Sequence, residues 1–484
     1  MESLRERTVT GIGWSATDAF VGHGITFLVG LVLARVLTPE EYGLVGIVAI
    51  FTAVLSGFVD SGFSSALIRK KETTDVDYTT MFLSNLVFSL LLFGALFIGA
   101  PWIARFFGRP QLVVLARVLG LTLIIQSFSL VQYTILSKRV DFKTKTKASI
   151  IAALSSGILG LGMAFSAFGV WSLVAQQLSY SLIYTVCLWI FNKWWPKFKF
   201  DLDSFRYMWG FGWKIMLSGF LDRLWRQLYQ AVVGKFYSPA TLGQYSRSKE
   251  YASLFSSNFT SVVQRVSYPV LAEVQDDKTR MLAAYRKIIK NTMFVTAMVL
   301  IPMGGVAEPF IYCLIGEQWH QAASFLPFIC VSMSLYPLHA INLNMLQVQG
   351  RSDVFLILEI IKKVIAVGPI CLGIFLNIYW MLIGSIITGV ISFFLNSYYS
   401  GRELGYSSWM QLHDIASSYG IAALIAVSVY FFKYLPVSYW IVFPIQVVVG
   451  ATLFFFLCEM TKMEEYTEIK GIVLQYIRKQ KHVH

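Results

Sequence analysis

Long apolar stretches, separated by short polar turns, run along the whole chain. A membrane-spanning helix needs about 20 mostly apolar residues, and the 484-residue sequence holds fourteen stretches of that kind. They lie near residues 10–35, 42–66, 78–104, 112–137, 147–167, 169–191, 208–235, 241–270, 283–307, 322–348, 354–376, 378–400, 414–433 and 437–459. The loops between them are short, so the pattern predicts an all-α polytopic membrane protein with no soluble catalytic domain.

The turns that end these stretches repeat along the chain. The string GIGW at residues 11–14 returns as GFGW at 210–213, an offset of 199 residues. The turn R-x-x-T-P-x-x-x-G at 35–43 returns as K-x-x-S-P-x-x-x-G at 235–243, an offset of 200. Internal repeats of this size are typical of secondary transporters.

The offset pairs the seventh to twelfth stretches with the first six. Because six is even, both halves enter the membrane from the same side, which makes the repeat parallel. We therefore predict a six-helix bundle over residues 1–200, a second over 201–405, and two appended helices with a tail over 406–484.

Composition and charge agree with a membrane protein. The chain is 56% hydrophobic and 14% charged, whereas soluble domains have about 25% charged residues. With the N-terminus inside, the predicted cytoplasmic segments hold 28 of the 40 Lys and Arg residues and the opposite face holds six. This asymmetry predicts cytoplasmic N- and C-termini. The basic residues behind the net charge of +13 then set the membrane topology and face the lipid headgroups, which argues against nucleic acid as a partner.

Charged side chains inside a predicted span are the candidate functional residues, because burying them in a bilayer is costly unless they face water or each other. The seventh stretch is exceptional in carrying Lys214, Asp222, Arg223 and Arg226. Positions 214, 218, 222, 226 and 230 are polar and follow one another at steps of four, so they form one stripe down the helix. Asp222 lies near the middle of this span, and the repeat offset matches it with His23 in the first span.

Further candidates lie in neighbouring spans. Asp18 is in the first span, Asp60 in the second, and Arg247, Lys249 and Glu250 in the eighth. A cavity lined by these groups is net positive. Arginines suit a diphosphate, whose oxygens accept paired hydrogen bonds. The three carboxylates, Asp18, Asp60 and Glu250, and also His23, could titrate and couple transport to an ion gradient.

Structural roles compete with these assignments. Asp222 and Arg226 could be an ion pair that only holds the halves together, and Lys214 could extend to the interface. Arg247 and Lys249 could be surface groups, and Asp60, next to Gly62, could cap or kink a helix. The strings Asp75-Val76-Asp77 and Asp201-Leu202-Asp203 resemble metal–nucleotide ligands, but they fall in short loops that we expect to be solvated. Five scattered cysteines lack C-x-x-C spacing, so we expect no metal or cofactor.

Four strings carry a family resemblance: LARVLTPEEYGLVGI (33–47), DSGFSSALIRKK (60–71), SYPVLAEVQDD (267–277) and LNMLQVQGRSD (343–353). They resemble the polysaccharide transporter family of the multidrug/oligosaccharidyl-lipid/polysaccharide (MOP) flippase superfamily. The resemblance implies two six-helix bundles around a central cavity. It also implies alternating access that moves a polyprenyl-diphosphate-linked oligosaccharide to the outer leaflet of a bacterial inner membrane. His23 stands where a further cation on the first span would be expected.

The first hypothesis is therefore a flippase for surface polysaccharide (O-antigen, capsule or exopolysaccharide), with membrane lipids and the polymerase and chain-length machinery as partners. A cation-coupled multidrug exporter of the same superfamily is the second, although it would favour an acidic cavity. A membrane enzyme using the same lipid carrier would need a long extracytoplasmic loop, and we predict no catalytic residues. A scaffold would not need charges at matched depths in two repeats.

Overall fold

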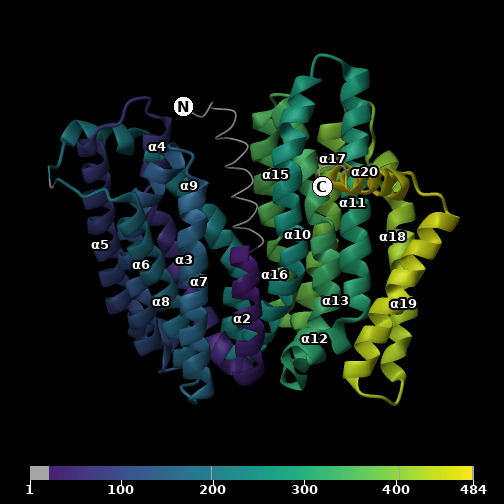
Figure 1. Cartoon of the computed structure of the whole chain (residues 1–484), viewed down its shortest axis with the longest axis horizontal. Coiled ribbons are helices and arrows are strands. Elements are labelled where there is room, and N and C mark those ends of the chain that lie inside the picture. The colour runs from purple at the N-terminus through teal and green to yellow at the C-terminus, as the bar shows by residue number, and fades with distance from the viewer. Residues whose placement is uncertain (1–20, 198, 403, 482–484) are drawn as a thin grey trace. The chain divides into compact units, whose positions relative to one another are not determined.

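The computed structural model describes residues 21–197, 199–402 and 404–481, and within these ranges it contains helices but no strands. Figure 1 shows them as long, mostly upright rods. The α-helices are α2 (His23–Val36), α3 (Pro39–Asp60), α4 (Phe63–Arg69), α5 (Asp75–Phe107), α6 (Leu112–Lys138), α7 (Phe142–Phe165), α8 (Val170–Asn192), α9 (Leu202–Phe236), α10 (Pro239–Glu273), α11 (Lys278–Gly305), α12 (Ala307–Ile315), α13 (His320–Ser334), α14 (Tyr336–Val348), α15 (Ser352–Ile365), α16 (Val367–Phe375), α17 (Ile378–Arg402), α18 (Ser408–Tyr430), α19 (Tyr439–Met460) and α20 (Glu464–Lys481).

Ten helical segments in the described ranges are long and apolar enough to cross a membrane, which confirms a multi-pass, all-helical protein. Four predicted spans do not reach that standard. The helices α9 and α10 have 35 residues each, but their polar positions lower their hydropathy. The eleventh span is divided between α15 and α16, and the first contributes only the shorter apolar helix Gly24–Val36. The count of fourteen therefore stays a prediction.

Side-chain caps fix several helix starts. Thr38 with Glu41, and Thr74 with Asp77, form capping boxes at the starts of α3 and α5. In each box the threonine hydroxyl accepts from a backbone N–H in the first turn while the acidic side chain accepts from the threonine N–H, so that two exposed donors are satisfied. Asp201 caps α9 through the N–H of Ser204.

The second predicted span is broken near its end. The helix α3 ends at Asp60, Ser61 and Gly62 adopt left-handed conformations with φ of 50° and 71°, and α4 then begins. A Cβ on Gly62 would lie 2.4 Å from the carbonyl oxygen of Gly212. Position 62 thus requires glycine for two reasons, its backbone angle and the close approach of another chain segment.

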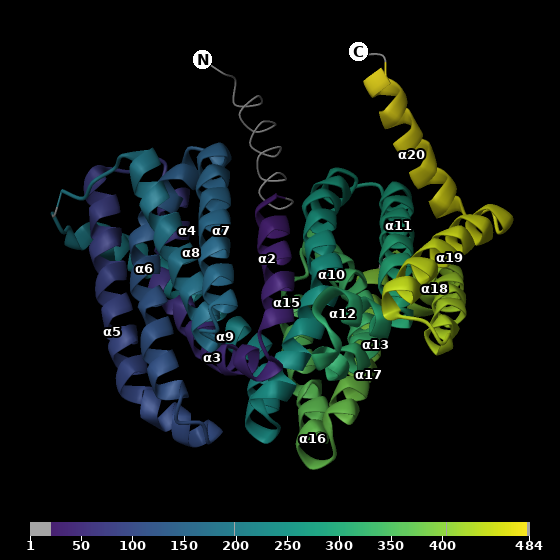
Figure 2. The same ribbon diagram turned by 60° about the horizontal axis from the view of Figure 1, so that its bottom comes forward.

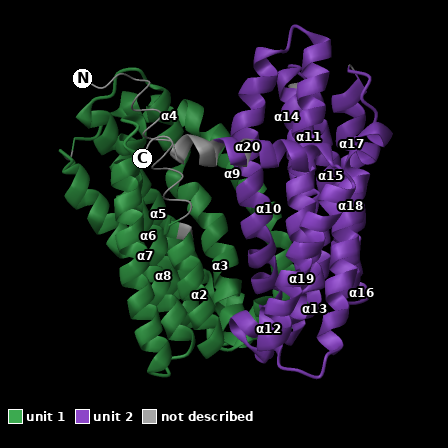
Figure 3. Cartoon of the chain, turned by 45° about the vertical axis from the view of Figure 1, so that its right-hand side comes forward, with its two compact units in different colours: residues 1–243 green, residues 244–484 purple. Residues whose placement is uncertain are grey.

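The chain forms two compact units, Met1–Gly243 and Gln244–His484, coloured separately in Figure 3. In unit 1, α9 packs against α3, α4 and α5, around a core that includes Phe63, Met81 and Met208. Unit 2 has a core of its own with Tyr285, Leu338 and Phe393. The repeat in the sequence predicted domain boundaries near residues 200 and 405. The compact units are defined by spatial contacts instead, so the predicted boundaries stay a prediction.

The repeated turns of the sequence meet each other inside unit 1. A Cβ on Gly43 would lie 1.6 Å from the carbonyl oxygen of Pro239, and a Cβ on Gly243 would lie 2.0 Å from the carbonyl oxygen of Pro39. The starts of α3 and α10 therefore cross with their backbones in direct contact. Gly43 of α3 faces Pro239 of α10, and Gly243 of α10 faces Pro39 of α3. We call these four residues the glycine–proline crossing. Only glycine allows so close an approach.

Replacing Gly43 with alanine should push the two helix starts apart, because the new methyl group meets a backbone oxygen that cannot rotate away. We expect Gly43→Ala to lower the free energy of unfolding by about 1–3 kcal/mol, seen as a lower thermal midpoint of the purified protein. Gly94→Ala is the control, since a Cβ at Gly94 has no neighbour within 4 Å. Equal midpoints for the two variants would refute the close crossing.

Candidate functional site

The charged helix α9 runs antiparallel along α3 within unit 1. Gly212 lies against the backbone of Ser61 and Gly62, and twenty-two residues later Gly234 lies against Ile47. Between these points the Phe58 and Phe220 rings pack with centroids 4.5 Å apart. The polar residues of α9 are therefore held at defined heights beside the second predicted span.

Arg223 turns toward α3. Its Nη1 donates a hydrogen bond of 2.9 Å to the Ser56 hydroxyl. The guanidinium also lies over Gly57, where a Cβ would come 3.1 Å from Nη1. One turn further along, the Oε1 of Gln227 is buried and has no hydrogen-bond partner in the described structure. Arg223 and Gln227 thus share the face of α9 that meets α3, and the sequence stripe at steps of four did not include Gln227.

The predicted stripe lies on another, more open face of α9. Arg226 Nη2 and Asp222 Oδ2 form an ion pair of 2.7 Å, with side chains 66% and 55% exposed. Lys214 is also exposed, with its ammonium 6.0 Å from the centroid of the Trp213 ring. The structure therefore separates the adjacent residues Asp222 and Arg223. One faces outward and pairs within its own helix, and the other contacts α3.

Asp60 caps the short helix α4. Its Oδ1 accepts from the Ser64 backbone N–H at 3.3 Å and from the Ser64 hydroxyl. Ser64 in turn accepts a hydrogen bond of 2.9 Å from Thr134 of α6. Asp60 lies one turn after Ser56 on α3, and the Ser56 hydroxyl accepts the hydrogen bond of Arg223. The capping role that the sequence left open is therefore present, and it places Asp60 close to Arg223.

The other candidate residues belong to unit 2 or lie outside the described part of the chain. Asp18 lies outside the described residues. His23 begins α2, but its side chain is likewise not described. In unit 2, Arg247 pairs with Glu250 at 2.8 Å, with side chains 13% and 46% exposed. The Lys249 ammonium lies 5.9 Å from the centroid of the Tyr245 ring.

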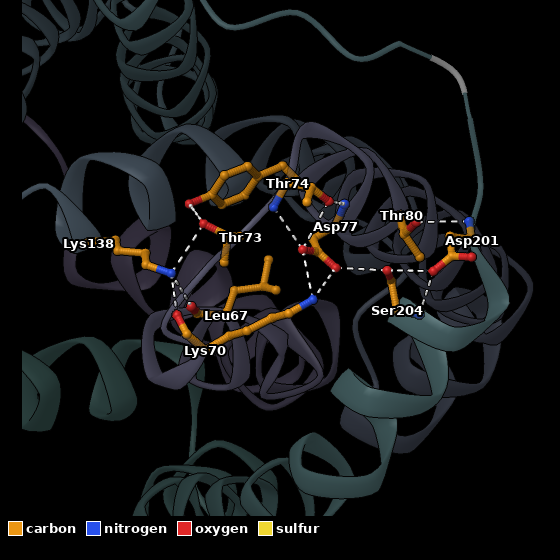
Figure 4. Close-up of polar contacts among 10 residues, drawn as sticks. Leu67, Lys70, Thr73, Thr74, Asp77, Thr80, Lys138, Asp201 and Ser204 are labelled. Atoms are coloured by element: carbon orange, nitrogen blue, oxygen red, sulfur yellow. Dashed lines mark hydrogen bonds and ion pairs between the residues drawn. The ribbon is translucent and has the colours of Figure 1, made fainter.

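A buried polar cluster ties the start of α9 to α4 and α5 (Figure 4). At its centre, the Asp77 carboxylate accepts from the Lys70 ammonium at 2.7 Å and from the Ser204 hydroxyl at 2.7 Å. It also accepts from the Thr74 backbone N–H at 2.8 Å. The Asp77 side chain is 2% exposed. The expectation of solvated D-x-D loops was wrong for Asp77, because its ion pair with Lys70 and its hydrogen bonds compensate its burial.

Lys138 and Asp201 complete this cluster. The Lys138 ammonium donates to the carbonyl oxygens of Leu67 and Lys70, which tethers the segment after α4. Asp201 accepts from the Ser204 hydroxyl at 2.6 Å and its N–H at 2.8 Å. These hydrogen bonds hold the pKa of the Asp201 carboxyl below its usual range. Both D-x-D strings thus serve the attachment of α9.

A second polar group, in unit 2, joins α11, α14, α17 and α18. Asn342 Oδ1 accepts from Tyr285 at 2.7 Å and from Ser400 at 2.5 Å, as expected of interhelical hydrogen bonds. Nearby, Arg286 pairs with Asp414 at 2.5 and 2.6 Å through two nitrogens. Sequence analysis missed this pair, because Arg286 counts as a loop cation and nothing along the chain links it to Asp414.

Comparison with known proteins identifies the family. Residues 32–324 match the family described as polysaccharide biosynthesis protein. The chain belongs to this family. It is 25% identical over 372 residues to the succinoglycan biosynthesis transport protein ExoT of Rhizobium meliloti, covering 77% of this chain and 75% of ExoT. It is also 25% identical over 359 residues to the teichuronic acid biosynthesis protein TuaB of Bacillus subtilis, covering 73% and 74% of the two chains.

Solved structures show the same fold. The inward closed conformation of the lipid II flippase MurJ matches with a TM-score of 0.70 at 14% identity, covering 94% of this chain and 98% of MurJ. An inward-facing multidrug resistance MATE transporter of the MOP superfamily matches with a TM-score of 0.61 at 18% identity, covering 80% and 98%. This member of the polysaccharide biosynthesis family therefore shares the fold of these two proteins. ExoT is named as a transport protein, MurJ as a flippase and the MATE protein as a transporter.

The Asp77 cluster gives a direct test of how α9 is attached in this family member. Asp77→Asn removes the charge that pairs with Lys70, and we expect it to lower the free energy of unfolding by about 1–3 kcal/mol. The matched control is Asp203→Asn in the other D-x-D string, where the side chain is 89% exposed. Its effect should stay within about 0.5 kcal/mol. Thermal unfolding of both variants measures the difference, and similar losses would contradict the central role of Asp77.

Proposed function

We propose that this protein is a flippase that moves a polyprenyl-diphosphate-linked oligosaccharide from the inner to the outer leaflet of the bacterial inner membrane. It would act by alternating access during surface polysaccharide assembly, with both termini in the cytoplasm. Membrane lipids, the polysaccharide polymerase and the chain-length machinery would be its partners. The observation that carries the proposal is that one helix, α9, carries three cations, with Arg223 held against α3 by Ser56 and with Arg226 and Lys214 on its more open face.

Arg223 and Arg226 are the proposed diphosphate ligands, and Lys214 lies nearer the start of the same helix. A guanidinium has five N–H donors in a fixed plane, and phosphate oxygens accept them in pairs. The Ser56 hydroxyl accepts from Nη1 of Arg223, so the guanidinium is oriented before any substrate arrives. Asp222 already pairs with Arg226, so an incoming diphosphate would compete with that carboxylate. His23, Arg247 and Lys249 are the further ligands proposed from sequence.

Two observations support this proposal: the names of the related proteins and the contact between the repeated turns. The names of ExoT and TuaB refer to the biosynthesis of succinoglycan and of teichuronic acid, and MurJ is named as a flippase of lipid II. The reciprocal glycine–proline crossing brings together the two turns that recur 200 residues apart. Such internal repeats are typical of secondary transporters.

Removing both arginines should abolish transport without preventing insertion. We expect Arg223→Ala combined with Arg226→Ala to reduce flipping of a fluorescent polyprenyl-diphosphate oligosaccharide in proteoliposomes at least tenfold. Loss of a hydrogen bond to a charged group costs about 1.5–3 kcal/mol, and 1.4 kcal/mol is tenfold.

Arg206→Gln is the control, because it removes an exposed cation, 71% exposed, from the start of the same helix. It should leave the rate unchanged. Undiminished surface polysaccharide in cells that carry only the double variant would refute the diphosphate site.

We also propose that Asp60, with Asp18 and Glu250, couples transport to an ion gradient. Asp60→Asn separates this role from capping, because the amide oxygen can still accept from Ser64 while the charge is lost. We expect the asparagine variant to fold normally and to transport without acceleration by an imposed proton or sodium gradient. Wild-type transport in sealed vesicles that ignores both gradients would rule out the coupling role.

A further inference from the structure

The last helix, α20, divides into an acidic and a basic half. Glu464, Glu465 and Glu468 lie in its first five residues, and no acidic residue follows them to the end of the chain. The remainder carries Lys470, Arg478, Lys479 and Lys481. A helix with charges segregated in this way presents two different surfaces along its length.

Ion pairs and hydrogen bonds attach the acidic half of α20 to α11 and α19. Lys290 of α11 pairs with Glu464 at 2.8 Å and with Glu465 at 3.1 Å. Lys287 pairs with Glu468, and these partners hold the pKa values of Glu464 and Glu468 below their usual range. The Tyr466 hydroxyl donates to Glu459 of α19 at 3.0 Å, and the ring is buried in a cluster with Phe294 and Val429.

Because its acidic half is attached to α11 and α19, the direction of the whole helix α20 is set by these contacts. In Figure 1, α20 runs across the direction of α11, α18 and α19, and in Figure 2 it extends away from α18 and α19. A helix that runs across the spanning helices, which themselves cross the bilayer, can lie along the membrane surface rather than span it.

The basic half has the sequence of a helix that lies in the membrane interface. Apolar residues occupy positions 469, 472, 473, 476 and 477, which is the i, i+3, i+4, i+7, i+8 spacing of one apolar face. Ile469, at the start of this face, packs against the core of unit 2, so the part of the face that we assign to lipid begins at residue 472. Basic residues accompany that face, and the sequence is too polar to span a bilayer. Amphipathic helices with these properties insert their apolar face at the boundary of headgroups and acyl chains, and their lysines and arginines bind anionic lipids.

We propose that the second half of α20, residues 470–481, binds the anionic lipid surface of the cytoplasmic leaflet. The ion pairs to α11 hold the helix parallel to that surface, the apolar face enters the interface, and Arg478, Lys479 and Lys481 bind phosphate headgroups. This binding site is separate from the diphosphate site on α9 and does not depend on the transported substrate.

The test uses two fluorescent positions in the full-length protein. Gln480 falls on the apolar face of α20 and Gln475 on another face, so Gln480→Cys and Gln475→Cys carry an environment-sensitive label without removing an apolar residue. Both are made with Cys371→Ser, because Cys371 is the exposed cysteine among the five and the other four are buried. The proteins are placed in nanodiscs of phosphatidylcholine, with or without phosphatidylglycerol.

We expect the label at position 480 to shift to the blue and resist an aqueous quencher in anionic nanodiscs, whereas the label at 475 stays accessible. Neutralising Arg478, Lys479 and Lys481 to glutamine should weaken the bound state roughly a hundredfold, since each basic residue near an anionic surface contributes about fivefold. High salt should act in the same direction.

Equal accessibility of position 480 in both lipid mixtures would overturn the proposal. The proposal would also be overturned if the label at position 480 resisted the aqueous quencher equally in both lipid mixtures and charge neutralisation did not change this. The helix would then be docked on protein rather than on lipid. An unchanged flipping rate for the neutralised variant would show that the diphosphate site on α9 is intact.

Discussion

The close approach of two backbones at the glycine–proline crossing is the contact on which the rest of unit 1 depends. Gly43 meets the carbonyl oxygen of Pro239 while Gly243 meets that of Pro39, so the starts of α3 and α10 are fixed to each other by residues that recur 200 positions apart. The helix α9 ends at Phe236, three residues before Pro239, and the crossing therefore also fixes where α9 ends.

The position of α9 follows from attachments along its length. The Asp77 cluster holds its start, Gly212 lies against the break between α3 and α4, and Arg223 bonds to Ser56. These contacts give a helix rich in charge a defined rotation about its axis. One face, with Arg223 and Gln227, meets α3, while Asp222 and Arg226 stay exposed. A cationic site on a rigid helix can orient a diphosphate more strongly than one on a mobile loop.

The sequence predicted the helices well because apolar length and turn residues act locally. The repeated turns at 35–43 and 235–243 also identified the crossing segments, although not that they touch each other. The sequence did not predict the rotation of α9, because steps of four define a polar stripe but not which neighbour it faces. It missed the burial of Asp77 for a similar reason, since its partners Lys70 and Ser204 are 7 and 127 residues away. Contacts between distant segments depend on packing, which local patterns do not encode.

The central claim is that the cations of α9 recognise a diphosphate, and direct binding tests it without requiring transport. Polyprenyl diphosphate and polyprenyl monophosphate, both without sugar, are titrated into the purified protein and followed by native mass spectrometry. Because the second phosphate adds a charged partner for a second guanidinium, the account predicts at least about tenfold tighter binding of the diphosphate. It also predicts that this preference disappears when Arg223 and Arg226 are replaced. Equal affinity for the two lipids in the wild-type protein would contradict the account.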